Sequence, residues 1–189
     1  SYEFQLTPGA YDLRVDGSDQ NALETEWNIN ITTDQTWVFS GSDTPVSTGD
    51  GELDYTATPN FGSVALQGGF LPDPHEVAIV SGGTVNVRGL SLGTGCTGYA
   101  SSAPDFRINW SGTASRLRIF FVADGNFEDA TMIVNDASGR WHCNDDHTGL
   151  NPLVEINNPP AGQMDVWVGS YSSGDFIAGT LYITELDLP

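Results

Sequence analysis

The sequence predicts an all-β protein, built as an antiparallel β-sandwich or jelly roll. Long runs with the 3.6-residue apolar period of an amphipathic helix are missing. The 22 glycines and 10 prolines divide the 189 residues into short runs, in which apolar and polar residues alternate with period two. Short strands at such spacing, without helices between them, are typical of sandwiches and jelly rolls.

The expected strands are alternating runs bounded by turn residues. In the first part of the chain they cover residues 2–6, 11–16, 26–32, 36–40 and 53–57. Farther on they cover residues 63–66, 76–80, 84–88, 106–110, 116–122, 131–135, 140–143, 164–168 and 179–185.

A turn-rich segment, Thr58–Gly62, predicts a boundary between two parts of the chain. We expect an N-terminal β segment or small β subdomain over residues 1–60 and a β-sandwich domain over residues 61–189. The second part is long enough to bury a core of its own.

The charge of the chain is strongly acidic. Twenty-five acidic residues stand against six arginines, and the formal net charge is −19. Such a charge repels nucleic acid and anionic membranes, so neither is an expected partner. It suits a cation-rich or calcium-bearing medium, although most of the acids are explained by solvation of the surface. No apolar run approaches the roughly 18 residues that span a bilayer.

The two cysteines, Cys96 and Cys143, are expected to form a disulfide. They lack the Cys-x-x-Cys spacing of zinc and redox sites, and the small residues around them together with the charge indicate export. The bond would close a loop of about 48 residues and stabilise the fold by roughly 4 kcal/mol. Two free thiols in a cytosolic protein are the alternative.

The loop from Asn144 to Asn151 is the best candidate for a metal site. Ca²⁺ takes about six to eight oxygen ligands from carboxylates, amides and backbone carbonyls. This loop can supply such oxygens from Asn144, Asp145, Asp146 and Asn151, and Asp129 can approach from the strand that begins nearby in a hairpin. Adjacent aspartates repel each other unless a cation or hydrogen-bond donors compensate them. The residues leave two alternatives open, a calcium site and a solvated turn rich in Asn and Asp, and the expected disulfide anchor at Cys143 favours calcium.

Catalytic residues are not assigned. His142 and His147 flank Cys143, but an oxidised Cys143 is lost as a zinc ligand, so a zinc site is not expected. The chain has no Gly-x-Ser-x-Gly nucleophile motif. A hydrolase is the least favoured class.

Two of the five tryptophans are candidate ligand-binding residues. Trp110 and Trp141 lie at strand ends among polar residues, where an exposed ring can hold the face of a sugar. The alternative for each is core packing with a satisfied indole N–H. Trp37 and Trp167 lie among Val and Phe residues and are expected in the core.

Five segments of the second part of the chain match a known family pattern: Asp129 before Thr131–Val134, the turn Asn135–Gly139, Asp145 and Asp146, Pro159–Gly162 and Met164–Gly169. With these segments, the part from about Phe61 onward resembles the bacterial pre-peptidase C-terminal (PPC) domain family. The resemblance covers about two-thirds of the chain, and the paired cysteines and the segment 69–74 depart from the family pattern. It implies a secreted, non-catalytic accessory β-sandwich, often calcium-stabilised and sometimes bound to a polymer. The resemblance therefore also favours calcium over a solvated turn in the loop from Asn144 to Asn151.

These observations predict a secreted or cell-surface domain without catalytic activity, whose partner is an extracellular polymer, a glycan or a protein. A second hypothesis is a subunit of a surface layer, adhesin or filament. In that case the N-terminal run Tyr2–Leu6 would add a strand to the sheet of a neighbouring copy.

Overall fold

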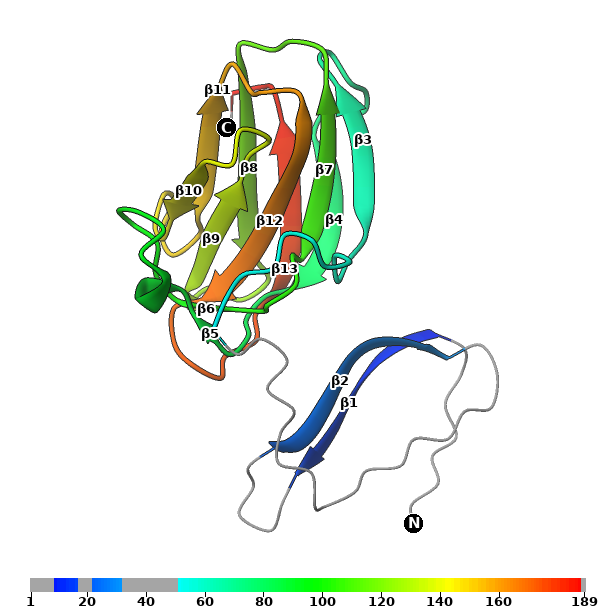
Figure 1. Ribbon diagram of the computed structural model, residues 1–189, viewed down its shortest axis with the longest axis vertical. Helices are drawn as coiled ribbons and strands as arrows, with labels where there is room; N and C mark the ends of the chain where they lie inside the picture. The colour runs from blue at the N-terminus through cyan, green and yellow to red at the C-terminus, as the bar shows by residue number, and fades with distance from the viewer. Residues whose placement is uncertain (1–8, 17–21, 32–50, 188–189) are drawn as a thin grey trace. The chain divides into compact units, whose positions relative to one another are not determined.

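The computed structural model describes residues 9–16, 22–31 and 51–187, and it confirms the all-β prediction (Figure 1). The chain divides into two compact units, residues 1–48 and 49–189. Among the described residues, the only helical element is the 3₁₀ turn η1 (Val87–Leu90). None of their helices has the length and apolar character needed to cross a membrane.

The N-terminal unit contains an antiparallel hairpin of β1 (Gly9–Asp16) and β2 (Ala22–Ile31). Its register pairs Gly9 with Ile31 and Asp16 with Ala22, with two irregularities between. The hairpin confirms the strands expected over residues 11–16 and 26–32. The strands expected over 2–6 and 36–40, and Trp37 with them, lie outside the described residues.

The second unit is a sandwich of a seven-stranded and a four-stranded sheet (Figure 1). In the larger sheet, β12 lies between β9 on one side and both β7 and β6 on the other. β10 then pairs with β9, β3 with β7, and β5 with β6. The strands are β3 (Ser63–Gln67), β5 (Val85–Asn86), β6 (Tyr99–Ala100), β7 (Phe106–Ser111), β9 (Ala130–Asn135), β10 (Trp141–Asn144) and β12 (Gly162–Ser170).

The smaller sheet has the order β11 (Leu153–Asn157), β8 (Arg116–Ala123), β13 (Ala178–Thr184) and β4 (His75–Val80). Its pairs are antiparallel, whereas β3 and β7 of the larger sheet run parallel. The edge strands β10 and β11 contact each other, so this side of the sandwich brings the two sheets together.

The main core lies between the sheets and follows from the alternation in the sequence. On β8, Leu117, Ile119 and Phe121 are fully buried, while the residues between them are partly exposed. They pack in one cluster with inward-facing residues of the other sheet such as Met132 and Val166. Burial of each such side chain contributes about 1.5–3 kcal/mol.

A second, smaller core covers part of the outer face of the larger sheet. Ile133 of β9 and Trp167 of β12 point outward from the main core, yet both are fully buried. They are covered by Leu53 and by residues of the segment 85–100. For this reason both faces of β9 are buried along its whole length, and both faces of β12 are buried along most of its length.

Three sequence expectations are corrected by this arrangement. Residues 51–60 belong to the sandwich, because the contact boundary lies between Thr48 and Gly49 and not at residue 60. Residues 53–57 do not form a strand, since the Asp54 carboxylate accepts hydrogen bonds from the backbone and hydroxyl of Thr56 and closes a turn. The run 84–88 is a strand only over two residues before η1 begins. The short strand β6 and the strand β11 were not predicted.

Candidate metal site and two neighbouring hollows

The β9–β10 hairpin brings three carboxylates to one end of the larger sheet. Its register pairs Asn135 with Trp141 and Met132 with Asn144. Asp129 precedes β9 and Asp145 follows β10, so the antiparallel pairing places them side by side. One carboxylate oxygen from each of Asp129, Asp145 and Asp146 lies within 4.8 Å of the other two. The sequence prediction that Asp129 approaches this loop is thereby confirmed.

Two oxygens of this acidic cluster are inaccessible and lack a hydrogen-bond partner. They are Oδ1 of Asp129 and Oδ1 of Asp145. Burial, and then the charge of Asp146, raises the pKa of Asp129. Burial, followed by the charges of Asp146 and Asp129, raises the pKa of Asp145, against a smaller opposing effect of Arg88. Unpaired oxygens among like charges are costly, and a bound cation would remove that cost.

The disulfide expected from the sequence is present and lies next to the acidic cluster. Cys96 and Cys143 are joined with an S–S distance of 2.06 Å and a Cα–Cα distance of 5.0 Å. Cys143 lies on β10, two residues before Asp145, and Cys96 belongs to the second core. The bond therefore ties the start of the acidic loop to the segment that covers the outer face of the larger sheet.

Asn144 and Asn151, which were expected as metal ligands, hold the loop through hydrogen bonds. Asn144 Oδ1 accepts from the backbone N–H of Leu153 at 2.8 Å. Asn151 Oδ1 accepts from the backbone N–H of Ala123 at 3.0 Å. Their amide oxygens are therefore engaged in positioning the loop, and the carboxylates are the better ligand set.

Three carboxylates from two adjacent loops fit Ca²⁺. The ion is a hard cation that binds oxygen ligands in flexible geometry, and it completes its shell with backbone carbonyls or water. The two unpartnered oxygens show that protein donors do not already satisfy this cluster. The residues that would hold the ion are Asp129, Asp145 and Asp146.

Calcium affinity should rise with pH. Protons compete with a cation for Asp129 and Asp145, whose pKa values are both raised. Calorimetry in buffers of different ionisation enthalpy should show protons released on calcium binding at about pH 5 and hardly any at about pH 8. Equal affinity and no proton release at both pH values would contradict the involvement of these two groups.

The turn that joins β9 to β10 is organised by the buried carboxylate of Asp136. Its Oδ1 accepts hydrogen bonds from the backbone and hydroxyl of Ser138 and from the backbone of Arg140. Its Oδ2 lies 2.7 Å from Nε2 of His142. Burial raises the pKa of Asp136, but the hydrogen bonds from His142, Ser138 and Arg140 outweigh it and lower the pKa to about 2.

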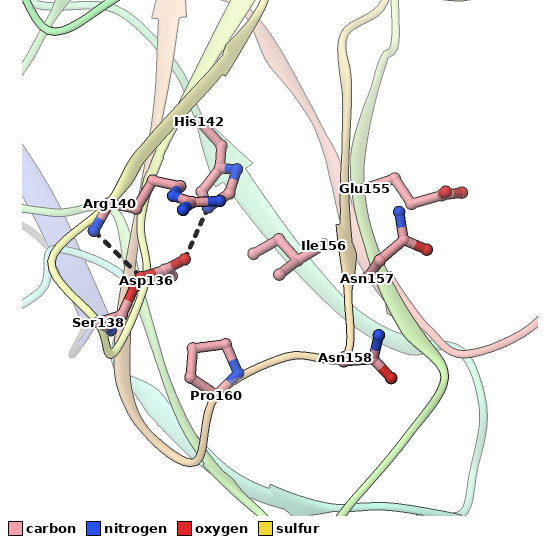
Figure 2. A pocket seen from close by; sticks show the side chains of 9 residues that line it. All are labelled: Asp136, Ser138, Arg140, His142, Glu155, Ile156, Asn157, Asn158 and Pro160. Atoms are coloured by element: carbon pink, nitrogen blue, oxygen red, sulfur yellow. Dashed lines mark hydrogen bonds and ion pairs between the residues drawn. The ribbon is translucent and has the colours of Figure 1, made fainter.

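Two hollows flank this turn, and Asp136 borders both. The first measures about 400 Å³ and lies between the turn and β11 (Figure 2). The second measures about 450 Å³ and lies on the other side, toward β12. The first is lined by Asp136, Ser138, Arg140, His142, Glu155, Ile156, Asn157, Asn158 and Pro160.

The Asp136–His142 pair has a structural explanation. In catalytic Ser–His–Asp sites, the imidazole also contacts the nucleophile. Here the hydroxyl of Ser138 donates to Asp136 instead, and no described Ser, Thr or Cys side chain hydrogen-bonds to His142. The pair stabilises the turn. It was not predicted from the sequence, although the six-residue spacing of Asp136 and His142 across a hairpin could have indicated it.

The two tryptophans proposed as ligand-binding residues differ in exposure, since Trp110 is buried and Trp141 is partly exposed. Trp110 is only 2% exposed and packs edge-on against Phe70 in the main core, so the expectation of an exposed ring is wrong for this residue. It points inward on β7, with Phe106 and Ile108. Trp141 is partly exposed and lines the second hollow. Trp167 is fully buried, as expected.

Comparison with protein-family models and with curated proteins finds no match for this chain.

Proposed function

We propose that the chain forms an extracellular, non-catalytic binding domain, in which a calcium ion held by Asp129, Asp145 and Asp146 completes a disulfide-anchored loop. The observation that carries this proposal is the pair of inaccessible, unpartnered oxygens within a cluster of three carboxylates. Surface acids without a cation normally face water, whereas these two oxygens face neither water nor a donor.

The role of the ion is preorganisation. The disulfide fixes one end of the acidic loop at Cys143, and the hydrogen bonds of Asn144 and Asn151 fix its course. The carboxylates are the part of this arrangement that repel one another. A bound cation compensates that repulsion and orders the surface around the β9–β10 hairpin before a partner arrives. The protein then loses less conformational entropy when the partner binds.

An extracellular location agrees with the disulfide, since such bonds persist in oxidising compartments. The millimolar calcium of extracellular fluids also suits a site with few protein ligands, because modules of this kind bind calcium weakly. The resemblance to secreted PPC accessory domains points to the same role.

Calcium should stabilise the protein against heat, and Asp145→Asn should abolish that effect. At a calcium concentration about 100 times the Kd, binding adds about 2.7 kcal/mol to the free energy of unfolding. Without calcium, the variant should be at least as stable as the wild type, because the substitution removes one of three repelling charges. Differential scanning calorimetry with calcium and with a chelator measures both effects.

Asp124→Asn is the matched control. It removes the same charge from an exposed residue of the β8–β9 loop, outside the cluster, so its response to calcium should equal that of the wild type. The proposal fails if millimolar calcium changes neither the heat of titration nor the melting temperature of the wild type. It also fails if the two variants respond alike.

A further inference from the structure

The second hollow has the composition of a binding site. It lies on the outer face of the larger sheet, where the second core ends, and measures about 450 Å³. Two aromatic residues, Tyr55 and Trp141, border it together with the polar side chains of Asn135, Gln163 and Asp165. Ligand pockets combine aromatic side chains with polar groups that converge on the same space.

The aromatic walls are held in place by buried neighbours. Trp141 packs against Trp167 with ring centroids 5.5 Å apart. Trp167 is fully buried, and its indole N–H donates to the backbone oxygen of Ser102 at 3.2 Å. Tyr55 is 50% exposed, so a large part of its surface is open to a ligand.

The polar floor is a closed network that fixes the loop bearing Tyr55. Asp165 is buried, and its carboxylate accepts from Arg107 Nε and from Gln163 Nε2, each at 2.7 Å. The backbone oxygen of Tyr55 accepts from Arg107 Nη2 at 2.7 Å and from Gln163 Nε2 at 3.0 Å. Arg107 also binds the backbone oxygen of Ala57. Tyr55 is therefore positioned from the sheet, although it lies outside any strand.

The same network decides the charge of an acceptable ligand. The side chains that line the hollow include no cation, and the nearby Arg107 is neutralised by Asp165. The remaining carboxylate at the border, Asp136, engages the turn and His142. In a chain of net charge −19, this surface rejects anionic ligands and has no free carboxylate arranged to hold a cationic one.

We propose that Tyr55 and Trp141 form a subsite for a neutral hexopyranose oligosaccharide. The C–H face of a pyranose ring is apolar and packs on an aromatic ring, while its hydroxyl groups donate to and accept from carboxamides. Asn135 supplies a carboxamide beside the rings. Gln163 supplies its amide oxygen, because its Nε2 already donates to Tyr55 and Asp165. This assignment rests on the proposed function, because it takes the domain to be an extracellular binding module. It does not require calcium at the hollow.

The test is calorimetric titration of the full chain with maltohexaose, cellohexaose and mannohexaose in calcium-containing buffer, with an oligogalacturonate as the anionic comparator. At least one neutral oligosaccharide should bind with a Kd of millimolar or tighter, and the anionic one should not. Tyr55→Ala and Trp141→Ala should each weaken binding about tenfold or more, and Trp141→Phe should retain most of it.

Tyr171→Ala is the matched control, because Tyr171 is a similarly exposed tyrosine outside the hollow, and its affinity should equal that of the wild type. Thermal melts of Trp141→Ala show whether a loss of binding comes from unfolding of the variant. Tyr55→Ala tests the same subsite at a half-exposed residue, whose replacement disturbs the packing less. Absence of binding by the wild type to all three neutral oligosaccharides overturns the assignment, as does unchanged affinity in both alanine variants. Calcium titration of the same samples shows whether the metal proposal stands independently of that result.

Discussion

Replacing both Cys96 and Cys143 by alanine should lower the free energy of unfolding by about 4 kcal/mol. The bond joins residues 47 apart, so its loss frees a long loop in the unfolded chain. The magnitude is large because single domains are stable by only about 5–15 kcal/mol. Cys96 is 9% exposed and small, so alanine leaves little empty space in the second core.

The same substitution should weaken calcium binding. The bond connects β10, at the start of the acidic loop, to the segment that covers Trp167 and Ile133. Without it, the positions of Asp145 and Asp146 relative to Asp129 depend on hydrogen bonds alone, and binding an ion must then order the loop.

Urea unfolding and calcium calorimetry measure the two effects. The control is chemical reduction: a strong thiol reductant should bring the wild type to the level of the double variant and leave the variant unchanged. Equal urea midpoints for the oxidised wild type and the variant would contradict the stabilising role of the bond.

Ionisation of the buried carboxyl group of Asp105 should lower the free energy of unfolding as the pH rises, and this is the second large effect. Asp105 lies directly before β7 and is 1% exposed. It accepts hydrogen bonds from the backbone of Val168 at 2.7 Å, from Asn60 Nδ2 at 3.1 Å and from Ser101 Oγ at 3.4 Å. Burial exceeds the opposing effect of these hydrogen bonds and raises the pKa of Asp105 to about 7.

The direction of the effect follows from the protons bound in each state. In the unfolded chain Asp105 loses its proton near its ordinary value of 3.8, whereas in the folded protein its raised pKa of about 7 retains it. Between these values the folded state binds more protons, so the free energy of unfolding falls as the pH rises. The full change is on the order of 4 kcal/mol. Asp136, with its pKa lowered to about 2, acts in the opposite direction and only below about pH 4.

Asp105→Asn should remove most of this slope. The asparagine oxygen can still accept from Val168, and the amide can donate to the hydroxyl oxygen of Ser101. Urea unfolding between about pH 4 and pH 8, with a calcium chelator present, measures the slope for each variant. Asp175→Asn changes the same charge on an exposed loop and should keep the wild-type slope. Parallel slopes for wild type and Asp105→Asn would show that Asp105 is ionised in the folded protein.

The strands of the sandwich could be predicted where the pattern was local. Leu117, Ile119 and Phe121 alternate with exposed neighbours, as a strand with one buried face requires. Residues 53–57 look similar in sequence, but Asp54 hydrogen-bonds to the backbone of Thr56 and diverts the chain into a turn. Such a side chain competes with the strand, and alternation alone does not reveal which of the two wins.

The candidate metal site was predicted in part for the same reason. Asp129, Asp145 and Asp146 meet because a hairpin pairs residues at fixed offsets from its turn. Asn144 and Asn151 could face an ion only if their amide oxygens were free. Those oxygens instead accept hydrogen bonds from the backbone N–H groups of Leu153 and Ala123. Those donors come from other strands, so their positions were not contained in the loop sequence.

What the sequence determined by itself was the β class, the disulfide and the meeting of the three aspartates, since these follow from backbone periodicity, from the presence of only two cysteines and from hairpin pairing. The tertiary structure decided which faces are covered. Trp110 points into the main core, whereas Trp141 borders a hollow, because the segment 85–100 and Leu53 cover only part of the outer face of the larger sheet. Tyr55 reaches that hollow through the hydrogen bonds of Arg107, far along the chain. Exposure is set by contacts between distant segments, and a local pattern does not contain them.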